Sequence, residues 1–156
     1  MLDTVTFVGV LGCGLAAGVF FAFSTFVMQG LRRVPAETGM VSMQAINVAA
    51  PTPWFMTALM GTAAVCVVLA VWSLLDWGAG AGYRLAGAVL YLVGTIGLTI
   101  VYHVPRNDAL ARVLADDPAA PDMWAHYASR WTAWNHVRTV AALGAAALLT
   151  LALLAS

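Results

Sequence analysis

Apolar residues fill four long stretches of the chain, and most polar residues lie between them. The stretches cover residues 4–31, 54–75, 84–103 and 137–154. Each approaches or exceeds the ~20 apolar residues that a helix needs to cross a bilayer. The pattern therefore predicts an all-α protein, an integral membrane four-helix bundle that forms a single domain. Four spans and their connections use the whole chain of 156 residues, which leaves no room for a separate soluble domain.

The first connection, residues 32–53, is too polar to cross a membrane. Met40, Met43, Gln44 and Asn47 recur at helical spacing, which predicts one face of a short helix. We expect this helix to lie at the membrane surface and to end before the prolines at its C-terminal side.

The second and third connections differ in length. Residues 78–82 form a short glycine-rich turn, which predicts an antiparallel hairpin. We expect the third span to end at Pro105 and a separate interfacial helix to cover residues 107–115. Residues 123–155 contain no proline, so they predict one long helix whose last part is the fourth span, with Pro121 and Asp122 at its N-cap.

Composition agrees with a membrane protein, because 62% of the residues are hydrophobic and 9% are charged, against roughly 25% charged in a soluble domain. The net charge is zero and no basic cluster indicates nucleic-acid binding. Arginines gather in the first and third connections. The positive-inside rule therefore predicts a multi-pass protein of the plasma or inner membrane with both termini outside and the long connections in the cytoplasm.

Small residues in the first span predict close helix packing. Gly14-x-x-x-Gly18 lets helix backbones approach, so we expect this helix to be central in the bundle. The same motif could equally pack two copies of the chain together, so a homo-oligomer is an alternative. Cys13 and Cys66 form no C-x-x-C pair and are interpreted as small apolar residues.

Polar residues in or beside membrane spans are candidates for function, because their burial in lipid is unfavourable. Those of the first three spans and their connections are Ser24, Thr25, Gln44, Asn47, His103 and Asn107. Structural roles are open for all of them. Hydroxyls bond back to the preceding helical turn, buried amides pair with neighbours, and a histidine often ends a span.

The long helix carries the strongest pattern. Its residues Trp124, Tyr127, Trp131, Trp134 and Arg138 repeat at spacings of three and four and form one stripe, with Asn135 and His136 beside it. An interfacial aromatic belt is the alternative, but a belt holds its rings at one depth. We expect instead an apolar pocket for a planar aromatic ligand whose oxygen becomes anionic.

A metal or haem site is a further alternative. The histidines are His103, His126 and His136, and none is spaced as H-x-x-x-H. A bis-histidine haem requires two histidines that face each other at similar depth, which leaves His103 and His136 as the only pair to consider.

Four short motifs follow each other in the order seen in one known family. They are residues 23–26, residues 43–47, residues 104–110 with the form P-x-N-x-x-L, and residues 131–139 with W-x-x-W-N-x-x-R. On these residues the chain resembles the anthrone oxygenase-like membrane family, once described as a domain of unknown function. The resemblance implies a small membrane oxidoreductase, a monooxygenase that converts an anthrone to an anthraquinone with dioxygen and without metal or flavin. This chain has His103 where the family often has asparagine.

The resemblance and the residues together suggest a mechanism. The substrate enters from the lipid and stacks on Trp131 and Trp134, His103 or His136 removes a proton, and Asn135 and Arg138 stabilise the oxyanion. The remaining binding candidates are Tyr127, Asn107, Gln44, Asn47, Ser24 and Thr25.

The rival hypothesis is a non-catalytic membrane protein, either a complex subunit or a carrier of a hydrophobic ligand. In it Arg138 and Asn135 pair with Gln44, Asn47 and Asn107. A closed polar network without a cavity favours this rival. An apolar cavity beside Trp134 that opens to the bilayer favours the enzyme.

Overall fold

The structure is a computed structural model that describes residues 1–155. Within these residues, four helices are long and apolar enough to cross a membrane. They are Leu2–Arg33, Pro53–Leu75, Ala81–Leu110 and Ala120–Leu154. The predicted all-α membrane bundle is therefore confirmed, and the chain is a multi-pass membrane protein.

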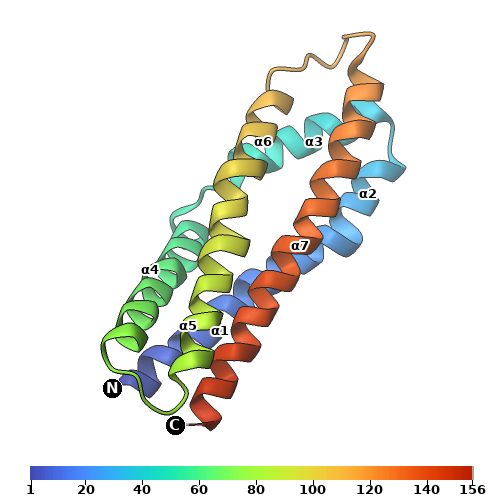
Figure 1. The fold of residues 1–156 in the computed structure, drawn as a ribbon. Helices are drawn as coiled ribbons and strands as arrows, with labels where there is room; N and C mark the ends of the chain where they lie inside the picture. The colour runs from blue at the N-terminus through green and yellow to red at the C-terminus, as the bar shows by residue number, and fades with distance from the viewer. Residues whose placement is uncertain (156) are drawn as a thin grey trace.

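The first, third and last of these helices run most of the length of the molecule, whereas the second covers only the part near the chain termini (Figure 1). The first joins α1 (Leu2–Ala22) to α2 (Met28–Arg33), the second is α4 (Pro53–Leu75), the third joins α5 (Ala81–Val89) to α6 (Val104–Leu110), and the last is α7 (Ala120–Leu154). Both ends of the described chain lie beside the α4–α5 turn. At the other end lie α3 (Ala36–Ala49) and the loop between α6 and α7.

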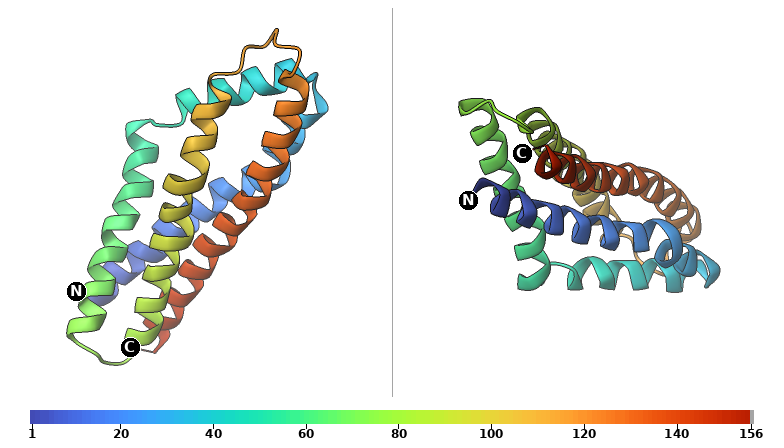
Figure 2. Two further views of the ribbon diagram at one scale, coloured as in Figure 1. Left: turned by 45° about the horizontal axis from the view of Figure 1, so that its top comes forward. Right: turned by 90° about the horizontal axis from the view of Figure 1, so that it is seen from below.

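Helices α1 and α7 pack along each other and make the most extensive contact in the bundle (Figure 2). Their buried small residues include Cys13, Ala16, Ala17, Ala142 and Ala145. The first helix is thus central, as the sequence predicts. The glycines are not the reason, because Gly14 and Gly18 are exposed and nothing lies near a Cβ built on either.

Three segments of the long helices are wound as π-helix. They are η1 (Phe23–Val27) in the first helix, and η2 (Leu90–Gly97) and η3 (Thr99–His103) in the third. A π-turn holds more residues than an α-turn, so it changes which side chains face the neighbouring helix. Sequence periodicity gives no sign of these segments.

The third helix continues through Pro105, contrary to prediction. Pro105 lies in the first turn of α6, where its missing N–H matters least. The separate helix predicted for residues 107–115 is absent from the described structure. The third helix itself extends to Leu110, and turns follow it.

The helix predicted in the first connection is present as α3, with Met40 and Met43 buried. It packs tightly against α2 and α7 at Gly39, where a Cβ would collide with the Leu31 carbonyl and press on Trp124. Glycine is therefore required at this crossing.

Helix α7 begins at Ala120, earlier than predicted, and its N-cap is Ala119. Pro121 and Asp122 lie in its first turn instead. The carboxylate of Asp117 accepts a hydrogen bond from the Ala119 N–H at 2.8 Å and closes the preceding turn.

Candidate functional site

A buried arginine lies at the junction of α1, α7 and the third helix. Arg138 is 6% exposed. Its Nε and Nη2 donate to Asn135 Oδ1 at 3.1 and 2.6 Å, and its Nη1 donates to Thr99 Oγ1 at 3.1 Å. Its guanidinium carbon lies 3.9 Å from the ring centre of Phe20 and 5.5 Å from that of Trp131. These contacts hold the cation in the apolar interior through dipoles and aromatic faces.

No carboxylate balances this charge within residues 1–155. All seven acidic residues of the chain are exposed, and none contacts Arg138. A guanidinium has five N–H donors, and three hydrogen bonds engage it here. The remaining donors have no acceptor among the described residues, so the site has capacity for an anionic oxygen.

Asn135 holds the arginine in place. Its Oδ1 receives two of the Arg138 hydrogen bonds, and its Nδ2 donates to the Phe20 carbonyl at 2.7 Å and to Ser24 Oγ at 2.8 Å. The side chain is fully buried, and both donors and the acceptor of its amide are engaged. Asn135 therefore links α7 to the first helix and orients Arg138.

The hydroxyls of η1 have different roles. Ser24 is buried and lies 3.1 Å from Thr139 Oγ1. Since Thr139 donates to the Asn135 carbonyl, the Ser24 hydroxyl must donate to Thr139. Thr25 is exposed and bonds back to the Phe21 carbonyl at 2.7 Å. Of the two, only Ser24 belongs to the site.

His103 lies against the same tryptophan as Arg138. The ring of His103 is 1% exposed and meets Trp131 edge to face, with 5.0 Å between ring centres. The backbone of Trp134 lies nearby, but neither imidazole nitrogen has a partner of good hydrogen-bond geometry within the described residues. A buried polar atom without a partner is unfavourable and marks a place where a ligand or a proton can bind.

Asn107 is a neighbour of His103 in space. Its Oδ1 accepts hydrogen bonds from the Tyr127 hydroxyl at 2.8 Å and from Trp131 Nε1 at 3.0 Å. The third helix is continuous between the two residues, so His103 and Asn107 both contact Trp131. Pro105 does not separate them.

The amides of α3 do not reach the arginine. Gln44 Nε2 donates to the carbonyls of Leu110 and Val113, at 2.8 and 3.0 Å. Asn47 lies beside the Tyr127 hydroxyl, and its amide nitrogen is buried without a partner of good geometry. Gln44 thus anchors α3 to the turn after α6, outside the Arg138 network.

The buried stripe of α7 differs from the predicted one at one position. Trp124, Tyr127, Trp131, Asn135 and Arg138 are buried, whereas Trp134 is 40% exposed. His136 is also exposed, because it is two residues from Arg138 and so roughly 200° around the helix. His103 and His136 therefore do not form a pair. No three His, Cys, Asp or Glu side chains in residues 1–155 gather at metal-binding distance.

A groove lies on the outer side of the aromatic stripe, between α6 and α7. We call it the α6–α7 groove. It has a volume of about 450 Å³, and its walls include Tyr102, Arg106, Leu110, Tyr127, Arg130 and Trp134. Tyr102 and Trp134 pack at 4.9 Å between ring centres, and Tyr102 also meets His103 edge to face at 5.4 Å. The groove therefore adjoins the buried site and is separated from it by aromatic side chains.

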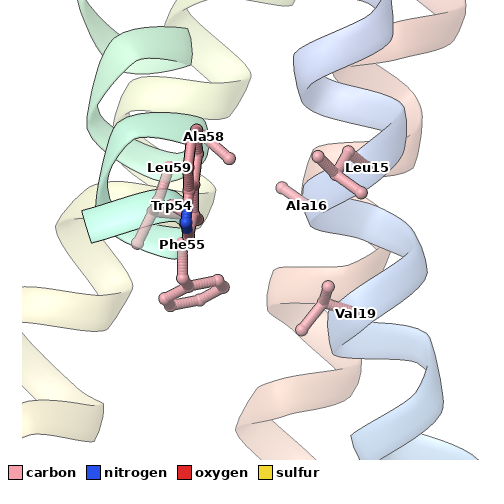
Figure 3. Close-up of a pocket in the computed structure, with 7 residues that line it drawn as sticks. All are labelled: Leu15, Ala16, Val19, Trp54, Phe55, Ala58 and Leu59. Carbon is pink, nitrogen blue, oxygen red and sulfur yellow. The ribbon is translucent and has the colours of Figure 1, made fainter. Parts of the chain in front are cut away.

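A second, smaller hollow of about 230 Å³ lies between α1 and α4. Figure 3 shows Trp54, Phe55, Ala58 and Leu59 of α4 facing Leu15, Ala16 and Val19 of α1. Its lining is apolar apart from the Trp54 indole nitrogen. It contains no residue of the Arg138 network.

These features define a four-helix membrane protein with a buried arginine centre beside an unpaired histidine. The chain belongs to the anthrone oxygenase family, whose model matches residues 53–148, more than half of the chain. The match confirms the resemblance found from the motifs. Neither a curated protein nor a solved structure matches the chain. The matched region carries His103, Asn135 and Arg138, whereas Ser24 and α3 lie outside it.

Sequence reasoning missed three residues of the network around Arg138. Phe20 and Thr99 contact the arginine directly. Thr139 acts one step further out, through Ser24 and the Asn135 carbonyl. An apolar ring and two threonines inside spans look like ordinary core residues. The available signal was Asn135, since a buried asparagine needs several partners.

Proposed function

We propose that this protein is a cofactor-independent oxygenase that acts on a hydrophobic phenolic substrate of the anthrone type. The observation that supports it is Arg138, a buried cation with unused donors and no carboxylate partner in the described structure. Such a cation favours an anion in the same low-dielectric environment. Trp131 contacts both Arg138 and His103, so a base and an anion-stabilising group lie beside one indole ring.

The chemistry needs only dioxygen as co-reactant. Removal of one proton from the substrate methylene gives a delocalised enolate. The enolate transfers one electron to dioxygen, and the resulting radical and superoxide combine at the former methylene carbon as a peroxide. The carbon then loses its second hydrogen as a proton while the O–O bond breaks, which yields the quinone and one water.

In this proposal His103 is the base, because its ring nitrogens are buried and unpaired and the lone pair of a neutral imidazole can accept a proton. Arg138 stabilises the enolate oxygen. Asn135 is a positioning residue, since its amide is already engaged. His136 has no role, because it is exposed. Trp131 and Trp134 supply the stacking faces for a planar substrate.

One observation favours a non-catalytic function instead. The described hollows do not open at Arg138, and its hydrogen bonds run through Asn135 and Ser24 to join α7 to the first helix. In that case the buried polar residues specify how the helices pack. The α6–α7 groove beside Trp134 supports the oxygenase over this candidate.

Oxygen uptake separates the two candidates. Purified protein in detergent or nanodiscs is mixed anaerobically with anthrone, oxygen is admitted, and quinone formation is followed optically. We expect uptake well above the spontaneous rate. Arg138→Gln should lower it by about 10²–10³-fold, as for other preorganised anion-stabilising donors. Arg84→Gln is the matched control, because Arg84 is also buried (3% exposed) but lies at the opposite end of the bundle.

His103 provides a second test. His103→Phe keeps a ring against Trp131 and should lower uptake by about 10²-fold, as expected for loss of a general base. Thermal unfolding of each variant shows whether it is folded. Wild-type uptake at the spontaneous rate, or folded variants that keep full activity, would exclude the oxygenase mechanism with this substrate class.

A further inference from the structure

The α6–α7 groove, which presents Trp134 to the proposed substrate, has a cationic rim that the oxygenase mechanism does not use. Its volume of about 450 Å³ lies within the range of small-molecule sites, roughly 300–1,000 Å³. Tyr102, whose ring meets that of His103 edge to face, lines the groove, and the buried His103 does not. The groove is thus a place where a ligand can bind without displacing the buried network.

One wall of the groove is aromatic. Tyr102 and Trp134 meet at 4.9 Å with an interplanar angle of 39°, and Trp134 is 40% exposed. An exposed indole beside a second ring offers a flat face for another planar ring. Leu110, Val113 and Met123 add apolar surface. The body of the groove therefore suits a planar apolar ligand.

The rim of the groove is cationic. Arg106 and Arg130 line it together with His126, and no carboxylate of the described residues does so. The guanidinium of Arg106 lies 3.5 Å above the ring centre of Tyr102 and donates to the Tyr102 carbonyl at 3.2 Å. This stacking holds one cation over the aromatic wall, and a guanidinium binds carboxylates in a bidentate geometry.

We propose that the α6–α7 groove binds a planar aromatic carboxylate, with its ring on Trp134 and its acid group at Arg106 and Arg130. The cationic rim selects the carboxylate, and the flat aromatic wall behind it selects the planar ring. An anionic phospholipid would also pair with the arginines, but it has no planar ring to stack on Tyr102 and Trp134. The inference concerns binding alone and holds whether or not the protein oxidises a substrate.

Binding is measured by isothermal titration in nanodiscs of neutral phosphatidylcholine, under argon, so that no turnover contributes. The probes are 9-anthracenecarboxylate and 9-anthracenemethanol, which share a ring system and differ in charge. We expect the acid to bind about fivefold more tightly than the alcohol, the advantage expected of partly exposed charge pairs. Arg106→Gln and Arg130→Gln should each abolish most of this preference. Arg32→Gln, an exposed arginine outside the groove, should retain it.

The aromatic wall has its own control. Trp134→Ala should weaken both probes by about fivefold, as expected for loss of an aromatic contact. Trp77→Ala, an exposed tryptophan in the α4–α5 turn, should change neither. Equal binding of acid and alcohol, or a preference that survives both arginine substitutions, overturns the proposal. Loss of the preference when phosphatidylglycerol is added identifies a lipid headgroup as the occupant and also overturns it.

Discussion

At the scale of single residues, the main feature of this protein is how Arg138 is kept in an apolar interior. A charge without a counter-ion is unfavourable there by several kcal/mol. Asn135 and Thr99 provide oxygen dipoles, and Phe20 and Trp131 provide aromatic faces. Each contact lowers the cost of burial, and none neutralises the charge. The residue is therefore stable in the free protein and still able to bind an anion.

Ser24 and Thr25 allow a direct test of this network. Ser24→Ala removes an acceptor from Asn135 and a donor to Thr139, so it should lower the free energy of unfolding by about 1–3 kcal/mol. Thr25→Ala removes a hydroxyl that bonds only to its own helix and should change that energy by about 0.5 kcal/mol or less. Reversible unfolding in mixed micelles measures both. Equal effects would show that the network does not stabilise the bundle.

At the scale of elements, the π-helical segments supply the site. Ser24 lies in η1, and Thr99 and His103 lie in η3, so Asn135 and Arg138 of α7 each bond to a hydroxyl from a widened turn. Such turns are frequent at functional sites, because they expose side chains and backbone that a regular helix would pair or turn away. The third helix also passes Pro105 directly after η3. A regular α-helix through this proline would be kinked or broken.

The crossing of α2, α3 and α7 gives a prediction at this scale. A methyl group at Gly39 would collide with the Leu31 carbonyl, which cannot move without its helix. Gly39→Ala should therefore destabilise the protein by about 1–3 kcal/mol. Gly30→Ala is the matched control, since nothing lies near its added Cβ, and it should stabilise the helix by about 0.5–1 kcal/mol. Thermal unfolding in detergent compares them. A neutral Gly39→Ala would mean that α3 is not packed there.

At the scale of the whole molecule, charge differs between the two ends of the bundle. Most arginines belong to segments at the end that carries α3 and the α6–α7 loop (Figure 1). Helix α2 ends with Arg32 and Arg33, α6 contains Arg106, the α6–α7 loop contains Arg112, and the first third of α7 contains Arg130. Near the opposite end lies Arg84, which is buried and donates to the Ala79 carbonyl. We propose that the α3 end faces the cytoplasm of the cell that makes the protein.

Cysteine labelling tests this orientation. In a background with Cys13 and Cys66 replaced by alanine, Glu37→Cys and Asp117→Cys should be protected from an impermeant maleimide in intact cells. Asp76→Cys, in the α4–α5 turn, should react. Permeabilised cells provide the control, because all three exposed positions should then react. Reaction of Glu37→Cys in intact cells would contradict the proposed topology.

The sequence by itself determined the class of the protein, an all-α membrane bundle with four long apolar helices. In the hydrocarbon of a bilayer, backbone N–H and C=O groups must form hydrogen bonds within the protein. A long apolar stretch therefore forms a helix, in which these groups bond to each other. The helices in the first connection and in residues 123–155 also follow from local periodicity and from proline positions. The ends of the helices were predicted less well. The third helix continues through Pro105, and α7 begins earlier than predicted, at Ala120, because the adjoining turns determine where a helix ends.

Only the tertiary structure decided which polar residues meet. From the sequence, Ser24 and Thr25 were equally good candidates for the site. The same was true of Trp134 and Asn135. Burial divides each pair, because one member faces the bundle and the other faces outward. The first pair lies in the π-helical segment η1 and the second in the regular helix α7, so packing between helices decides both cases and no local pattern records it. Thr99 and Phe20 join Arg138 for the same reason. Their contacts with it span three different helices, and the physical cause is the fit of those helices around one buried charge.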